Sequence, residues 1–173
     1  MKIKPIRLTA TSYALLALLE QLGESTPYEI KQAMEKSTEN FWPVPHTTAY
    51  EEPARLATGG YLTVRQEEGG RRRKAYSLTD EGRAALAAWA GEATVAPPQI
   101  RDELLLKIFA GADPGPLLKA RMAWHEEKIA ELRGYLDEVR GKDDWAPSEL
   151  VLTAGIGYHR KMLELMEGAE PEP

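Results

Sequence analysis

The sequence contains no cysteine, which excludes disulfide bonds, thiolate metal sites and cysteine nucleophiles. It also lacks a long apolar run, because the longest one, from Tyr13 to Leu19, is far too short to cross a bilayer. The first residues carry charge but not the apolar core of a signal peptide. We therefore expect a cytoplasmic protein without membrane contact.

Signatures of catalysis are missing too. The three histidines, His46, His125 and His159, do not have metal-ligand spacing, and the segment from His125 to Lys128 lacks the second histidine of a zincin helix. No glycine-rich loop follows an expected strand, and there is no nucleophile elbow. The sequence predicts no enzymatic activity, no metal and no cofactor.

An excess of positive charge is also lacking, since the net charge is -5. The charge is unevenly distributed, however. Residues 1–83 contain 12 Lys/Arg against 11 Asp/Glu, a net charge of +1, and residues 84–173 contain 10 against 16, a net charge of -6. Four cations stand together from Arg71 to Lys74. Because binding depends on where the charge lies, the acidic second half does not exclude a nucleic-acid partner for the first.

Start and stop signals divide the first part of the chain into three short helices. Thr9 is the expected N-cap of the first helix, and Thr26 to Glu29 forms a capping box with proline at the first position of the second. Glycines follow the first and the third. The expected helices span residues 10–22, 27–37 and 46–58.

The pattern then changes from helix to strand. Residues 61–65 and 74–78 have the β-branched and aromatic content of strands, and the turn cluster 67–70 between them predicts a hairpin. Thr79 caps a further helix that reaches about Trp89. Three helices followed by a hairpin are typical of a winged helix-turn-helix, whose third helix enters the major groove of DNA.

The proline-rich junction at 95–98 separates a second, helical part. Apolar residues from Leu118 to Val139 follow a heptad spacing that calls for a partner helix, and the last helix, about 147–166, offers a second apolar face. Gly155 and Gly157 would let a neighbouring helix approach closely. The predicted dimerisation residues are Leu118, Met122, His125, Ile129, Leu132, Leu136, Val139, Val151, Tyr158 and Met162.

We therefore expect a mainly α fold with a small β-hairpin wing. Residues 1–94 would form a winged helix-turn-helix DNA-binding domain, 95–167 a C-terminal helical dimerisation domain, and 168–173 a disordered tail. The residues predicted to contact DNA open the second and third helices or lie on the wing: Tyr28, Lys31, His46, Thr47, Thr48, Tyr50, Arg55, Arg71, Arg72, Arg73 and Lys74.

Each of these assignments has a structural alternative. Tyr50 would instead lie in the core, with Thr47 only capping the helix, and Arg55 would pair with an acidic neighbour on its own helix. The basic run at 71–74 would be a solvated hairpin. Phe41 and Trp42 are expected to be packing anchors rather than ligand contacts. A small-molecule effector pocket would draw on the larger aromatic residues, although we favour core or dimer packing for them: Trp89, Trp124, Trp145 and Tyr158.

In ordered combination, these segments resemble the PadR family of bacterial and archaeal transcription regulators. The matching segments are 8–9, 13–19, 28–30, 41–44, 50–56, 60–62, 69–82 and 101–109. The resemblance covers nearly the whole chain. It implies a homodimer that binds an inverted repeat in promoter DNA, commonly as a repressor, and that is sometimes released by a small or phenolic molecule.

The third helix departs from the family pattern. Pro53 replaces an apolar residue, removes the hydrogen bond to the carbonyl of Ala49 and is expected to kink or shorten the helix. Glu51 and Glu52 place two negative charges on the element that would approach phosphates. These features favour an alternative function, a winged-helix protein-interaction adapter without specific DNA binding.

Overall fold

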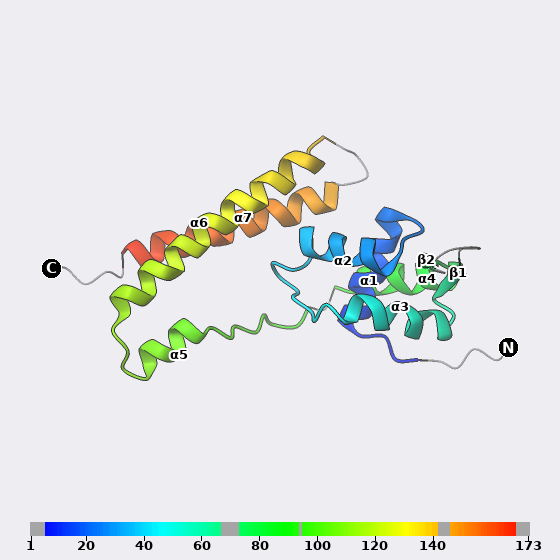
Figure 1. The fold of residues 1–173 in the computed structure, drawn as a ribbon, viewed down its shortest axis with the longest axis horizontal. Coiled ribbons are helices and arrows are strands. Elements are labelled where there is room, and N and C mark those ends of the chain that lie inside the picture. The colour runs from blue at the N-terminus through cyan, green and yellow to red at the C-terminus, as the bar shows by residue number, and fades with distance from the viewer. Residues whose placement is uncertain (1–5, 67–72, 94, 142–145, 169–173) are drawn as a thin grey trace. The chain divides into compact units, whose positions relative to one another are not determined.

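A computed structural model describes residues 6–66, 73–93, 95–141 and 146–168 of the chain (Figure 1). The chain divides into two compact units, Met1–Val95 and Ala96–Pro173. Within the described ranges, no helix combines the length and the apolar character needed to span a bilayer. Gly168, the first residue of the predicted tail, lies in a turn, and the rest of that tail lies outside the described residues.

The first two helices begin and end where the capping signals predict. Helix α1, Ala10–Leu22, has Thr9 as its N-cap in a capping box, and Gly23 closes it with a φ of 75°. Helix α2, Pro27–Lys36, is capped by Thr26 and Glu29, whose side chain accepts a hydrogen bond from the Thr26 amide at 2.7 Å. Both assignments are confirmed, because the hydrogen bonds that define these ends are local in sequence.

Helix α3, Thr48–Thr58, begins two residues later than predicted. The amides of Thr48 and Ala49 bond to the carbonyls of Pro45 and His46, three residues back, which makes a turn rather than an α-helix at this point. The expectation that Pro53 shortens the helix is wrong, because α3 continues through Pro53 to Thr58. The proline is fully buried in the domain core.

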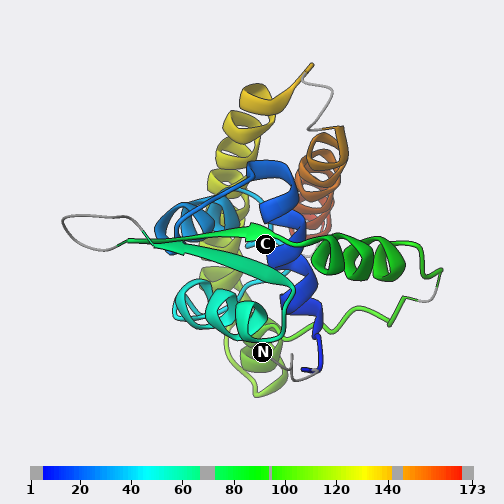
Figure 2. The ribbon, with the colours of Figure 1, turned by 90° about the vertical axis from the view of Figure 1, so that its right-hand side faces the viewer.

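The hairpin is also confirmed. Strand β1, Leu62–Gln66, pairs antiparallel with β2, Lys74–Leu78, in the register Leu62↔Leu78. Helix α4, Asp80–Ala90, follows directly and is capped by the Thr79 hydroxyl, which accepts a hydrogen bond from the Gly82 amide at 3.0 Å. In Figure 2 the two strands run side by side and α4 continues from β2.

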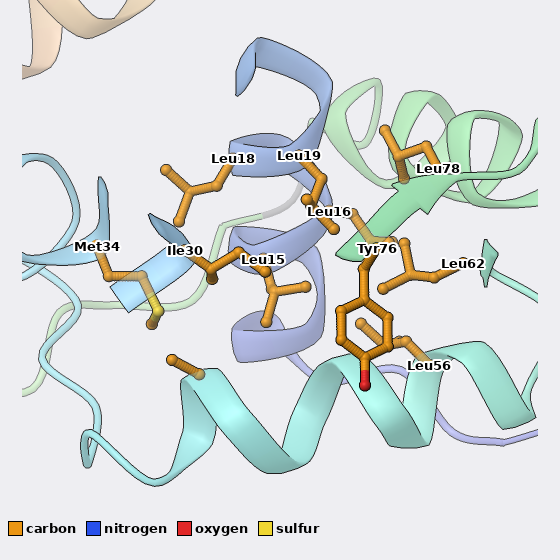
Figure 3. Close-up of a cluster of buried hydrophobic side chains, with 11 residues drawn as sticks. Leu15, Leu16, Leu18, Leu19, Ile30, Met34, Leu56, Leu62, Tyr76 and Leu78 are labelled. Atoms are coloured by element: carbon orange, nitrogen blue, oxygen red, sulfur yellow. The ribbon is translucent and has the colours of Figure 1, made fainter. Parts of the chain in front are cut away.

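One apolar core holds the first unit together (Figure 3). Leu15, Leu16 and Leu19 of α1 lie at its centre, each at most 1% exposed. The ring of Tyr76 points from β2 toward α3, where Leu56 is fully buried. Burial of this kind contributes about 25 cal/mol per Å² of apolar surface, so the core fixes α3 relative to α1 and the hairpin.

The described part of the second unit contains three helices. Helix α5, Glu103–Phe109, is followed by α6, Pro114–Val139, and α7, Ala146–Glu167. The two long helices lie side by side (Figure 1). Leu104 of α5 packs with Leu118 of α6 and Met166 of α7 in a small cluster that joins all three helices.

The structure provides a partner for the heptad stripe within the same chain. Ile129, Leu132 and Leu136 of α6 are buried against Leu152 and Ile156 of α7, in the same chain. The remaining stripe residues lie in or beside the two clusters or against α7: Leu118, Met122, His125 and Val139. A heptad stripe specifies an apolar helix face but not which chain covers it. Here α7 is the partner helix of α6, so the buried part of the stripe already has its partner within the chain.

The predicted apolar face of α7 lies beside the face that packs within the chain. Val151 and Tyr158 are 39% and 56% exposed, whereas the buried stripe contains the residues that follow them, Leu152 and His159. One residue is about 100° around a helix, so these two predicted dimer residues stay exposed, and their contact with a second copy stays a prediction. Met162 is half-buried beside the small cluster.

The two α7 glycines differ in the way they face α6. A Cβ on Gly155 would lie 3.3 Å from Leu132 of α6, which confirms a close helix approach at this position. A Cβ on Gly157 would meet nothing within 4 Å, so α6 does not approach closely at this position.

Candidate nucleic-acid interface

Helix α3 has one buried and one exposed face. Ala49, Pro53 and Leu56 are buried, with spacings of 4 and 3 residues that anchor the helix in the core. The opposite side exposes Tyr50, Glu51, Ala54 and Thr58. Tyr50 is 49% exposed, so the structure excludes the alternative in which its ring is part of the core. The major groove of DNA is wide enough to admit an α-helix with an exposed face of this kind.

A compact polar cluster connects α2 to the start of α3. The ammonium of Lys31 donates to Oε1 of Glu35 at 2.5 Å, and Nδ1 of His46 lies 3.7 Å from the same oxygen. The hydrogen bond to Glu35 raises the pKa of Lys31, with smaller electrostatic contributions from Tyr50 and Tyr28. Four predicted DNA-contacting residues, namely Tyr28, Lys31, His46 and Tyr50, are thus assembled at one place in the fold.

Three residues of this surface were missed by sequence reasoning. Gln32 is exposed, and its amide donates to the Tyr28 hydroxyl at 3.2 Å. Ala54 and Thr58 continue the exposed face of α3 beyond Tyr50. Helical spacing from Tyr28 and Tyr50 would have found all three, because residues three or four apart share a helix face.

Thr47 and Thr48 stand on either side of the start of α3. Thr47 takes the N-cap position, but its side chain makes no cap hydrogen bond, so the alternative role of a mere cap is not observed. Its side chain is exposed, and that of Thr48 is half-buried. Contact of both hydroxyls with DNA stays a prediction.

The described part of the wing carries positive charge close to α2. Arg73 and Lys74 are exposed at the start of β2. Hydrogen bonds from Thr26 lower the pKa of Glu29, and the charge of Arg73 adds to this effect. Arg73 is therefore near the first turn of α2. Arg71 and Arg72, also predicted to contact phosphate, lie outside the described residues.

Arg55 is engaged within the protein rather than pointing freely into solvent. Its guanidinium donates to both carboxylate oxygens of Glu52, at 2.7 and 2.6 Å, and to the hydroxyl of Ser12 at 2.9 Å. This is the acidic pairing on its own helix that the sequence offered as an alternative to DNA contact.

The expected packing role of Phe41 and Trp42 is wrong. Their side chains are 57% and 42% exposed, since the segment that connects α2 to α3 runs over the surface. The indole N–H of Trp42 donates to the Thr11 hydroxyl at 3.1 Å. Trp42 also borders a small open hollow of about 280 Å³, together with Met34 and Val44.

The aromatic residues considered for an effector pocket have different surroundings. Trp89 stacks on Tyr13 with ring centroids 4.6 Å apart, within the first unit. Trp124 and Tyr158 surround the buried histidines of the second unit. Trp145 lies outside the described residues. Among the residues that the structure describes, no group of three or more His, Asp or Glu side chains is placed to hold a metal.

Comparison with known families matches both units. Residues 15–88 match the transcriptional regulator PadR-like family, and residues 100–171 match the family described as virulence activator alpha C-term. The negative transcriptional regulator PadR of Bacillus subtilis (strain 168) is 28% identical over 134 residues, which cover 73% of each chain.

Solved structures show the same fold. The crystal structure of Bacillus subtilis PadR in complex with operator DNA superposes with a TM-score of 0.79 at 24% identity, covering 92% of this chain and 96% of that one. The structure of the same regulator with p-coumaric acid gives a TM-score of 0.71 at 22% identity, covering 94% and 96%. The PadR-like regulator from Bacillus cereus gives 0.76 at 23% identity, covering 91% and 94%. These neighbours confirm a winged-helix fold with a helical C-terminal part.

Proposed function

Because the chain belongs to the PadR-like family of transcriptional regulators, which are not enzymes, we propose that it is a homodimeric repressor of an inverted-repeat operator. The observation that carries this proposal is the surface on which Tyr28, Lys31, His46 and Tyr50 come together beside the exposed face of α3. The similarity to a negative regulator supports repression as the outcome. Such a protein acts on the chromosome, so we place it in the cytoplasm.

The surface has the chemistry of a duplex contact. Lysine, histidine and the wing cation Arg73 are suited to phosphates, which position a protein on DNA without reading sequence. The exposed α3 residues offer a phenol, a methyl group and a hydroxyl to base edges: Tyr50, Ala54 and Thr58. Glu51 repels phosphate, so we place it above the open groove rather than beside the backbone.

Two copies are needed for an operator with two-fold symmetry, whose half-sites lie about 34 Å or a multiple of it apart. Since α7 already covers the heptad stripe, we assign the dimer contact to apolar side chains that the second unit leaves exposed. On α5, Leu105, Leu106 and Phe109 are 57%, 64% and 89% exposed. Exposure of three large apolar residues on a seven-residue helix supports a protein partner there.

We extend the proposal to a small-molecule effector that releases the DNA. The support is the similarity to a regulator whose structure contains p-coumaric acid. Added p-coumaric acid is a direct test of this part, since a ligand that binds the folded protein raises its thermal midpoint. An unchanged midpoint and unchanged operator binding at saturating concentrations would exclude this compound as the effector.

Footprinting on the DNA upstream of the chain's own gene tests the main proposal. We expect protection of two related half-sites, and Lys31→Ala should weaken binding to all DNA sequences by removing a phosphate contact. Lys161→Ala is the matched control, because Lys161 pairs with Glu164 on α7 in the other unit. Weak, sequence-independent binding by the unaltered protein would instead support the protein-interaction adapter.

A further inference from the structure

A partly buried polar network ties α3 to α1. The Ser12 hydroxyl donates to Oε1 of Glu52 at 2.6 Å and accepts hydrogen bonds from Nη2 of Arg55 at 2.9 Å and from the Thr9 amide at 2.9 Å. A hydroxyl has one donor and two acceptor sites, so that of Ser12 is fully used. Ser12 itself is 0% exposed. We call Ser12, Glu52 and Arg55 the α3 anchor.

Several hydrogen bonds hold the side chains of the α3 anchor in place. Arg55 donates a hydrogen bond to each carboxylate oxygen of Glu52. This bidentate geometry makes an arginine–carboxylate pair both strong and directional. Burial raises the pKa of Glu52, but the hydrogen bonds from Arg55 and Ser12 outweigh it and hold that pKa below its ordinary value. A further bond at 3.1 Å joins Arg55 to the carbonyl of Arg7, ahead of α1.

The position of the α3 anchor matters because of Pro53. Without an N–H, Pro53 cannot bond to the carbonyl of Ala49, so the helical ladder is weakest at the centre of α3. The anchor residues Glu52 and Arg55 stand on either side of this gap. Side chains bound to α1 therefore hold the helix where its own backbone does not.

The exposed face of α3 extends across the same gap. Tyr50 precedes Pro53, whereas Ala54 and Thr58 follow it, so a bend at Pro53 would change the angle between the two halves of the face. Base recognition requires hydrogen-bond geometry to be kept to a few tenths of an ångström. Phosphate contacts by flexible lysines tolerate larger shifts.

Resting on the proposed DNA-binding function, we propose that the α3 anchor is a set of positioning residues that determines operator discrimination without touching DNA. Ser12, Glu52 and Arg55 keep the two halves of α3 at the angle that matches consecutive base pairs. Loss of the anchor lowers affinity for the operator but leaves affinity for unrelated DNA nearly unchanged. Arg55 acts through α3 and not through a phosphate.

The test compares Glu52→Gln with Glu20→Gln in the full-length protein. Both variants remove a carboxylate that pairs with an arginine, but Glu20 of α1 pairs with Arg83 of α4, and only Glu52→Gln breaks the α3 anchor. The ratio of operator to unrelated-DNA affinity should fall by about tenfold or more in Glu52→Gln relative to Glu20→Gln, the size expected for a lost charge-assisted hydrogen bond. Ser12→Ala is the milder variant for use if Glu52→Gln does not fold.

Salt dependence separates positioning from direct contact. If Arg55 neutralises a phosphate, Arg55→Ala lowers the logarithmic salt slope by about one. We expect an unchanged slope with a reduced discrimination ratio, and Arg55→Lys, which keeps the charge but not the fork, should share the defect. In a double-mutant cycle, Ser12→Ala and Glu52→Gln should be non-additive, because both break one network.

The outcomes distinguish the two proposals. If the unaltered protein shows no preference for any operator, the proposed function fails and this inference fails with it. If the unaltered protein discriminates and Glu52→Gln discriminates equally well, only the inference is overturned. A salt slope reduced by one in Arg55→Ala also overturns it, in favour of direct phosphate contact.

Discussion

Nδ1 of His125 lies 2.7 Å from Nδ1 of His159, a direct contact between two buried imidazoles of α6 and α7. Their rings are 1% and 4% exposed, and Trp124 packs edge-on against both. One nitrogen must donate and the other accept, so at least one ring is neutral. The charged groups that influence the pair are Arg121, Asp102 and Lys128.

This contact predicts an acid-sensitive C-terminal unit. Burial, the charge of His159 and that of Arg121 lower the pKa of His125 from 6.5 to about 4, and burial also lowers the pKa of His159. The unfolded chain therefore binds protons at a higher pH than the folded one. Stability is complete above pH 6.5 and is lost as the pH falls toward 4, with a loss of about 2 kcal/mol at pH 5.

Urea denaturation at pH 7.5 and pH 5 measures this loss. His125→Asn keeps a polar atom near the position of Nδ1 but cannot titrate, so its stability should change less between the two pH values. His46→Asn is the control, because His46 is exposed in the first unit. Equal pH dependence in His125→Asn and the unaltered protein would contradict the prediction.

Arg73 predicts a change in salt dependence. Because Arg73 is exposed on the wing near the first turn of α2, we expect it to neutralise one phosphate. Arg73→Ala should weaken operator and unrelated DNA alike and reduce the logarithmic salt slope by about one. Titrations at several salt concentrations measure the slope, with Arg133→Ala in the second unit as the control. Loss of discrimination at constant slope would mean that the wing reads bases.

Replacement of Pro53 by alanine should stabilise the protein. An interior proline costs a helix roughly 3 kcal/mol, and Pro53→Ala restores the N–H that bonds to the carbonyl of Ala49. Because the ring is fully buried, its loss offsets part of this gain, which leaves about 1 kcal/mol. The thermal midpoint should rise by about 2–4 °C in calorimetry. A lower midpoint would show that packing of the proline ring outweighs the missing hydrogen bond.

Replacement by alanine should change the stability of the protein in opposite directions at two glycines. A Cβ on Gly82 would lie 2.2 Å from the backbone oxygen of Tyr61, where α4 crosses the start of the hairpin. Gly82→Ala should therefore destabilise the protein by about 1–3 kcal/mol. Gly134 in α6 has open space around it, so Gly134→Ala should stabilise the protein by about 1 kcal/mol through helix propensity. Chemical denaturation of both variants checks the sign of each effect.

A charged side chain at position 109 should disrupt the proposed dimer contact. Its side chain is 89% exposed, so Phe109→Glu should leave the fold intact but place a charge in the subunit contact. Light scattering should then report a monomer, and operator affinity should fall because two linked units no longer bind together. Val95→Glu, at an exposed apolar position where the first unit ends, is the control. A dimer that persists in Phe109→Glu would place the interface elsewhere.

Local signals explain most of what could be predicted. The caps at Thr9, Thr26 and Thr79 involve residues within three positions of each other, so the sequence already contains both partners of each bond. The antiparallel pairing of the two strands likewise joins segments that are close in sequence. The predicted start of α3 is two residues too early. The segment after Pro45 forms a turn with hydrogen bonds to the carbonyls of Pro45 and His46, and its sequence does not distinguish such a turn from the first turn of a helix.

The sequence by itself determined which segments are helix or strand and that α6 has an apolar stripe, since these depend on neighbours along the chain. Only the tertiary structure decided what covers that stripe, because an apolar face accepts a helix from the same chain as readily as one from another. The tertiary structure also decided which groups Arg55 binds. Its partner Ser12 lies 43 residues away, and no local pattern shows that α1 brings a hydroxyl to the carboxylate of Glu52.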